Sequence, residues 1–192
     1  MKKIVTLLLI SIPLLATAQA KSNVSPYAKG AVNTVNGMVV FEKSIEDKTH
    51  SQAQLFQTMK DFLGTLVVMS ENEDRSKVTK EDSGNGILEA QVEEMLYFKR
   101  KPWETDATYF IYTIQIGCSA GNVKLKISQI RYIYDEDRFA TNALMTAEET
   151  ITDEHAFKAN GKTLRKEEGK FRKATIDRVN EIFNNAEQYV KN

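Results

Sequence analysis

The stretch from residue 109 to residue 127 reads YFIYTIQIGCSAGNVKLKI, and its pattern decides the fold. Large apolar side chains take every second position. They are Phe110, Tyr112, Ile114, Ile116 and Cys118, and then Val123, Leu125 and Ile127. A tight connection, Ser119-Ala120-Gly121-Asn122, separates the two runs. Alternation with period two on both sides of a short turn predicts an antiparallel hairpin with one buried and one solvent-exposed face.

The apolar positions change parity after Ile127, because the next ones are Ile130, Tyr132 and Tyr134. Side chains of a strand alternate strictly between the two faces, so a shift by one residue needs a bulge or the end of the pairing. We therefore expect a β-bulge near Ser128-Gln129.

Residues 87–98 show the same alternation upstream of the hairpin, behind a Gly-rich turn at residues 83–86. One face carries Leu88, Ala90, Val92, Leu96 and Phe98. The other face carries Glu89, Gln91 and Glu93, which we expect in solvent with Thr113 and Gln115. Glu94 interrupts the apolar row.

Two further strands are expected nearer the N-terminus. Residues 38–45 are rich in β-forming side chains and follow the turn signal Asn36-Gly37. Residues 75–82 are a weaker candidate, whose one apolar anchor is Val78. Residues 99–103 are expected to be a connecting loop.

Two amphipathic helices are predicted. The first begins at a capping box, Ser51 to Gln54, and carries an apolar stripe. That stripe comprises Leu55, Phe56, Met59, Phe62, Leu63 and Leu66. The second starts near Lys170, runs for about five turns and closes the chain. Its stripe comprises Phe171, Thr175, Val179, Ile182, Phe183, Ala186 and Val190.

The stretch from residue 135 to residue 169 is polar and has little periodicity. Thr146-Ala147-Glu148-Glu149 has the form of a capping box, so a short helix is one interpretation and an extended loop is the other.

The first twenty residues have the pattern of an export signal. Lys2 and Lys3 precede an apolar run, and small residues then allow cleavage after Ala18 or Ala20. The apolar run is shorter than the roughly 20 residues of a membrane-spanning helix. We expect residues 1–20 to be removed, leaving a flexible leader at 21–35 and one α+β domain at 36–192. The mature protein would lie in the periplasm or at the cell surface, without a transmembrane segment.

The charge balance argues against a nucleic-acid partner. The whole chain has 26 basic and 26 acidic residues. Loss of two signal lysines leaves the mature chain slightly acidic, whereas binding to nucleic acid depends on cationic contacts with phosphate.

The order of expected elements is β-α-β-β-β-β-α, which indicates an α+β domain with a curved antiparallel sheet and two main helices packed on one face. Here the chain resembles a known family. The segment Asn36-Gly37-Met38-Val39-Val40-Phe41-Glu42-Lys43, the turn from Asp82 to Ile87 and the closing helix are similar to exported proteins of gut and oral Gram-negative bacteria grouped as domain of unknown function 4468. The resemblance covers about residues 35–134 and the terminal helix. It implies a TATA-binding-protein-like fold, and it implies no catalytic residues because the family has no assigned activity.

No motif indicates a cofactor, a metal or a catalytic group. Cys118 is the only cysteine, so no internal disulfide can form, and we expect a buried thiol. The two histidines, His50 and His155, lack the ligand spacing of a zinc site. Glu89 and Glu93 lie about 13 Å apart on a strand. That separation exceeds the roughly 6.5–9.5 Å between the carboxyl groups of inverting glycosidases.

The best local candidate for partner binding is the expected loop at residues 99–103 with its aromatic neighbours. Its residues are Tyr97, Lys99, Arg100, Lys101, Trp103 and Tyr109. Tyr, Trp and Arg are over-represented at interaction hot spots. The alternative is that Trp103 covers the end of the core. A second candidate is the basic segment 161–173, which could meet an anionic surface.

Three functions remain open at this point. The first is a non-catalytic binding module of the bacterial envelope, whose partner is an envelope protein or glycan and whose surface is the open sheet face or the Trp103 loop. The second is a hydrolase acting on an envelope or dietary glycan or peptide. The third is a structural accessory protein of the envelope.

Overall fold

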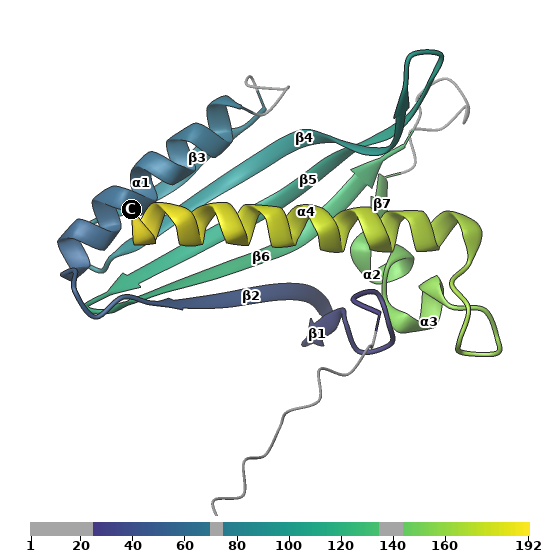
Figure 1. Ribbon diagram of the computed structural model, residues 1–192, viewed down its shortest axis with the longest axis horizontal. Helices are drawn as coiled ribbons and strands as arrows, with labels where there is room; N and C mark the ends of the chain where they lie inside the picture. Colours follow the sequence, from purple (N-terminus) through teal and green to yellow (C-terminus); the bar gives the residue numbers. More distant parts are fainter. Residues whose placement is uncertain (1–24, 70–74, 135–143) are drawn as a thin grey trace, which may run out of the picture.

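An open antiparallel sheet forms one layer of the molecule, and helices pack on one of its faces (Figure 1). A computed structural model describes residues 25–69, 75–134 and 144–192. The predicted signal at 1–20 lies outside the described residues. No described helix is long and apolar enough to cross a membrane.

The sheet has seven strands in the order β1-β2-β6-β5-β4-β3, and β7 also pairs with β6. The strands are β1 (Asn33–Val35), β2 (Met38–Glu46), β3 (Lys77–Asp82), β4 (Ile87–Lys101), β5 (Glu104–Ser119), β6 (Asn122–Ile133) and β7 (Leu144–Thr146). The helices are α1 (Gln52–Val68), α2 (Ala147–Thr150), α3 (Asp153–Ala156) and α4 (Lys166–Lys191). The predicted α+β class and antiparallel sheet are confirmed.

The core lies between the sheet and the two long helices. Every residue of the two predicted helical stripes is buried. The even-numbered apolar residues of β4 and β5, from Leu88 to Cys118, are also buried, apart from Phe98, which is partly buried. The Ser51 capping box is present in both directions. Burial of these large apolar side chains supplies the main driving force for folding.

The predicted bulge is confirmed at Gln129, which has a φ of 55°. The pairing of β5 with β6 shifts between Ile111↔Arg131 and Thr113↔Ser128, so β6 carries an extra residue there. The bulge lets Ile127 and Ile130 both enter the core.

The predicted leader at residues 21–35 needs correction over its described part. Residues 33–35 form β1, which pairs with β2. Arg172 on α4 holds the preceding segment, because its Nε donates to the carbonyl of Tyr27 at 3.0 Å and its Nη2 donates to the carbonyl of Ala28 at 2.6 Å. The buried guanidinium of Arg172, near the C-terminus, therefore holds residues 27–28 in place, although their sequence shows no apolar periodicity.

Three smaller expectations also need correction. Residues 99–101 continue β4, so the predicted loop is only the two-residue turn Pro102-Trp103. Val78 is 37% exposed and does not anchor β3, which is held by its pairing with β4. Helix α4 begins at Lys166, before the predicted start.

The polar stretch after residue 143 contains the short helix. Thr146 caps α2 and accepts a hydrogen bond from the backbone N–H of Glu149. The short-helix interpretation is therefore confirmed at residues 147–150, while residues 135–143 lie outside the described part.

Candidate functional site

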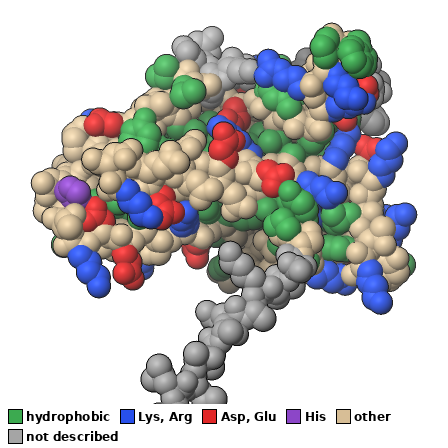
Figure 2. Space-filling model, in the orientation of Figure 1, with side chains coloured by type: hydrophobic (Ala, Val, Ile, Leu, Met, Phe, Trp, Pro, Cys, Tyr) green, Lys and Arg blue, Asp and Glu red, His purple; other side chains and the backbone are tan. Residues whose placement is uncertain are grey.

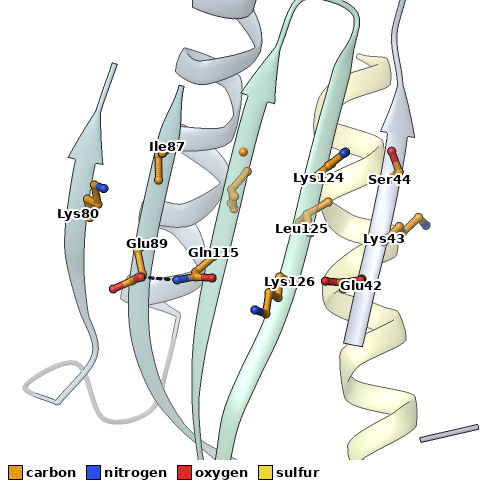
Figure 3. A pocket seen from close by; sticks show the side chains of 12 residues that line it. Glu42, Lys43, Ser44, Lys80, Ile87, Glu89, Gln115, Lys124, Leu125 and Lys126 are labelled. Atoms are coloured by element: carbon orange, nitrogen blue, oxygen red, sulfur yellow. Dashed lines mark hydrogen bonds between the residues drawn. The ribbon is translucent and has the colours of Figure 1, made fainter. Parts of the chain in front are cut away.

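A row of polar side chains crosses the sheet on the face opposite the helices (Figure 3). Five strands contribute one residue each in direct cross-strand register: Lys80, Glu89, Gln115, Lys126 and Glu42, from β3, β4, β5, β6 and β2. Directly opposite residues of antiparallel strands share a face and have Cβ atoms about 4.5–5.5 Å apart. The row is therefore a continuous line of charged and amide groups across most of the sheet.

The sheet is hollowed beside this row at Gly117. Gly117 has no side chain, and a Cβ atom built there meets nothing within 4 Å. It lies between Ile87 and Lys124 in register. The resulting groove has a volume of about 650 Å³ and is lined by the row, by Ile87 and by Lys124. We call it the Gly117 groove.

Glu89 is held in a fixed position at the floor of the groove. Its Oε2 accepts a hydrogen bond from Gln115 Nε2 at 2.7 Å, and its Oε1 accepts one from Thr79 Oγ1 at 2.8 Å. The bond from Gln115, then that from Thr79, and the nearby charge of Lys80 lower the pKa of Glu89. Glu89 is therefore an oriented carboxylate at neutral pH.

Three lysines around the groove form no ion pair with the described residues. Within residues 25–69, 75–134 and 144–192, Lys80, Lys124 and Lys126 have no carboxylate within 4.0 Å. The groove thus presents free ammonium groups beside one fixed carboxylate. Such a surface suits a polar, charged partner more than an apolar one.

The residues weighed as catalytic do not form a catalytic arrangement. Glu93 is only 4% exposed, against the expectation of a solvent-exposed side chain, and its Oε1 pairs with Arg75 Nη1 at 3.1 Å. His50 Nδ1 lies 2.6 Å from Asp47 Oδ2 in the loop between β2 and α1. The described residues hold no cluster of three His, Cys, Asp or Glu side chains suited to a metal ion.

The aromatic and basic residues named from the sequence lie along the β4–β5 hairpin. Trp103 sits at its tip and is 79% exposed, so it does not cover the core. Arg100 stacks over Tyr97 with its Cζ 4.6 Å from the ring centroid, and Lys101 Nζ lies 6.0 Å from that of Trp103. Figure 2 shows hydrophobic and basic side chains together at this end of the molecule.

One of the six named residues lies away from the hairpin tip. Tyr109 is paired with Met95, further down the hairpin. Lys99 forms an ion pair with Glu104 across the hairpin. The structure therefore brings Tyr97 and Arg100 together, and Lys101 and Trp103 together, and it leaves Tyr109 apart.

The basic segment 161–173 is not a free cationic surface. Arg172 is completely buried. Arg165 Nε donates to the carbonyl of Phe157 at 3.1 Å, and Lys170 Nζ pairs with Asp106 at 3.0 Å. Three of the six basic side chains in this segment therefore form hydrogen bonds or ion pairs with other parts of the protein.

The sequence analysis placed Glu89 and Gln115 on the open sheet face, but it did not single out Gly117 or the lysines around the groove, although a signal existed for two of these lysines. Lys124 and Lys126 alternate with the core residues Val123, Leu125 and Ile127, so their place on the open face follows from period two. Their register with Lys80 and Glu42 depends on strands far apart in the chain.

Comparisons with known proteins give a family and a fold. The model of the family described as "Domain of unknown function (DUF4468) with TBP-like fold" matches residues 41–133. A DUF4468 family protein from Bacteroides ovatus has a crystal structure similar to this one, with 28% identity, a TM-score of 0.78, and coverage of 86% of this chain and 93% of that chain. A TBP-like protein from Parabacteroides distasonis shows 20% identity, a TM-score of 0.67, and coverage of 84% and 97%. No curated protein matches the chain.

Proposed function

We propose that this chain, which belongs to the DUF4468 family with TBP-like fold through residues 41–133, is an exported, non-catalytic binding module. In this proposal, its open sheet face holds a polar, charged partner in the bacterial envelope. The fold by itself assigns no activity, so the proposal rests on the site.

The observation that carries the proposal is the Gly117 groove. A groove of about 650 Å³ lies beside a five-strand charged row, and three lysines around it are unpaired within the described part of the chain. The sheet fixes the backbone positions of these lysines in one register, and their charges make the open face electrostatically complementary to an anionic partner.

Export is supported by the lysine, apolar and small-residue order of residues 1–20. An envelope protein or glycan is the partner class that an exported module can reach.

A glycine pair in the chain permits a matched test. The protein from Lys21 to Asn192 is used as bait for envelope extract of its host, as wild type, Gly117→Leu and Gly64→Leu. A Cβ atom built at either glycine meets nothing within 4 Å, but Gly117 lies in the groove and Gly64 lies on α1. Gly117→Leu fills the groove without removing any charge.

A partner that wild type and Gly64→Leu retain and Gly117→Leu loses supports the proposal. Equal retention by all three proteins contradicts it. Trp103→Ala serves as a further arm, because loss of the partner only in that variant would move the binding surface to the hairpin tip. Capture of no partner by wild type also counts against a binding module.

A further inference from the structure

The charges of the row on the open sheet face stand in a self-complementary order (Figure 3). From β3 to β2 the charges are positive, negative, neutral, positive and negative, carried by Lys80, Glu89, Gln115, Lys126 and Glu42. Read from β2 to β3, the charges are negative, positive, neutral, negative and positive. When the row is laid on its own reverse, every charge therefore faces an opposite charge.

A two-fold axis between two sheets packed face to face produces this pairing in one orientation. Neighbouring strands lie about 4.8 Å apart, so Glu89 and Lys126 lie about 5 Å on either side of the central strand β5. Lys80 and Glu42 lie about 10 Å on either side of it. An axis along β5 places Lys80 over Glu42 of the second copy and Glu89 over Lys126 of the second copy. An axis along the row would place each charge over the same charge, which is repulsive.

The residues of β5 at the centre of the face permit this approach. On a two-fold axis each residue meets its own copy, so a bulky side chain there would meet an equal one. Gly117 has no side chain, and a Cβ atom built on it meets nothing within 4 Å. Gln115 donates to Glu89 through its Nε2, which leaves its Oε1 and a second N–H to pair with the amide of its copy.

The outer charges of the row are available to a partner. Lys80 and Glu42 are exposed, and neither forms a hydrogen bond or an ion pair with the residues that the structure describes. A partner with negative charges alone would attract the two lysines of the row but would repel Glu42 and Glu89. A second copy offers a carboxylate to each lysine and a lysine to each carboxylate, so its charges match the whole row.

We propose that the open sheet face binds a second copy of this chain, in a face-to-face dimer whose two-fold axis runs along β5. Symmetric dimers use the same patch on both subunits, and that patch must be complementary to itself. The inference rests on the proposed function and narrows it, because a second exported copy is itself an envelope protein. The shared part of the face is six residues long on five strands, or roughly 20 by 24 Å, which indicates a weak dimer.

The test measures self-association of the protein from Lys21 to Asn192 by sedimentation, from micromolar to submillimolar concentration and at low and high salt. Lys80→Glu and Glu42→Lys each reverse one charge of the outer pair. Neither change removes a contact within the described part of the fold. The matched control is Lys166→Glu, the same change at an exposed lysine of α4, on the other side of the sheet.

We expect the wild type to dimerise, with weaker association at high salt. Lys80→Glu or Glu42→Lys alone should weaken the dimer by about tenfold or more, because each homodimer would contain two like-charge contacts. Lys166→Glu should leave the affinity unchanged. An equimolar mixture of Lys80→Glu and Glu42→Lys should associate about as tightly as the wild type, because the heterodimer has opposite charges at both contacts. Recovery on mixing cannot come from two misfolded variants.

A wild type that stays monomeric over the whole concentration range, or a mixture that associates no more tightly than either variant alone, would overturn the inference. The dimer and the binding module can fail separately. A monomeric protein that captures an envelope partner only while Gly117 is intact would leave the binding module standing and exclude the second copy as its partner. A dimer that depends on the row, together with equal capture by wild type, Gly117→Leu and Gly64→Leu, would keep the dimer and contradict the proposed function.

Discussion

Arg178 on α4 donates two hydrogen bonds to Glu94 on β4, from Nε to Oε1 at 2.9 Å and from Nη2 to Oε2 at 2.6 Å. Glu94 is the residue that interrupts the apolar row of β4, and it is only 7% exposed. An acidic residue can occupy the helix-covered face because a planar guanidinium from the helix pairs with it in a bidentate manner.

Replacing Glu94 with glutamine should lower the free energy of unfolding by about 2–3 kcal/mol, because Arg178 would keep its charge without a carboxylate partner in a largely buried site. Urea unfolding measures the change. The control is Glu181→Gln, which removes a surface partner of the same arginine and should cost less than about 0.5 kcal/mol. Equal costs for the two variants would show that the pair with Glu94 is no more important than the surface one.

Replacing Arg172 with methionine should be more damaging, by about 3–5 kcal/mol, because it leaves several buried acceptors unsatisfied. Arg172 is fully buried and also donates to the carbonyl of Ile151 at 2.6 Å and to Asp153 at 2.8 Å. Thermal or urea unfolding measures the loss, with the exposed neighbour Lys173→Met as the control. Hydrogen exchange should also rise at residues 27–28, and protection unchanged there would contradict the assigned role.

Trp103 is the only tryptophan and is 79% exposed, so the tryptophan fluorescence reports on the hairpin tip alone. We expect the native protein to emit at the long wavelength of a solvated indole and to be quenched efficiently by acrylamide. Trp103→Ala should change the free energy of unfolding by less than about 0.5 kcal/mol. A blue-shifted native spectrum, or a large loss of stability, would place Trp103 in a buried environment.

Cys118 should resist thiol reagents in the native protein and react after unfolding. Its side chain is 4% exposed, and burial raises its pKa to about 11, which keeps the thiol protonated and unreactive. A Ser119→Cys variant places a thiol at the next, exposed position and should be labelled rapidly. Rapid labelling of wild type would contradict the buried position.

The same pKa shift predicts the direction of a pH effect. Unfolding releases the thiol to an ordinary pKa of about 8.5, so the unfolded chain loses this proton first as the pH rises. The contribution of Cys118 to stability is therefore present below about pH 8.5 and is lost as the pH rises towards 11. Cys118→Ala should show a smaller decline over this range in pH-dependent urea unfolding, and an identical decline would assign the effect to other groups.

The sequence by itself determined the main elements of this protein, although not the short β1, β7 and α3. Period two identified the three long strands β4, β5 and β6. The 3.6-residue stripes identified both long helices, and the capping boxes at Ser51 and Thr146 marked helix starts. The parity change after Ile127 even located the bulge. These signals could be read from the chain because each depends only on neighbours within a few residues, which local geometry relates directly.

Only the tertiary structure decided which charges are buried and which remain free. Arg172 stands in a basic run like its neighbours, yet it is buried because carbonyl groups about 145 positions earlier accept its hydrogen bonds. Lys126 is aligned with Lys80 and Glu42 because strands that are far apart in the chain pair in one register. Within the described residues, the Nε of Arg131 is buried without a hydrogen-bond partner, at the point on β6 between its pairings with β2 and β7. Whether a charged side chain is buried or paired depends on the groups that surround it in space. A local sequence pattern does not specify those groups, because they come from distant parts of the chain.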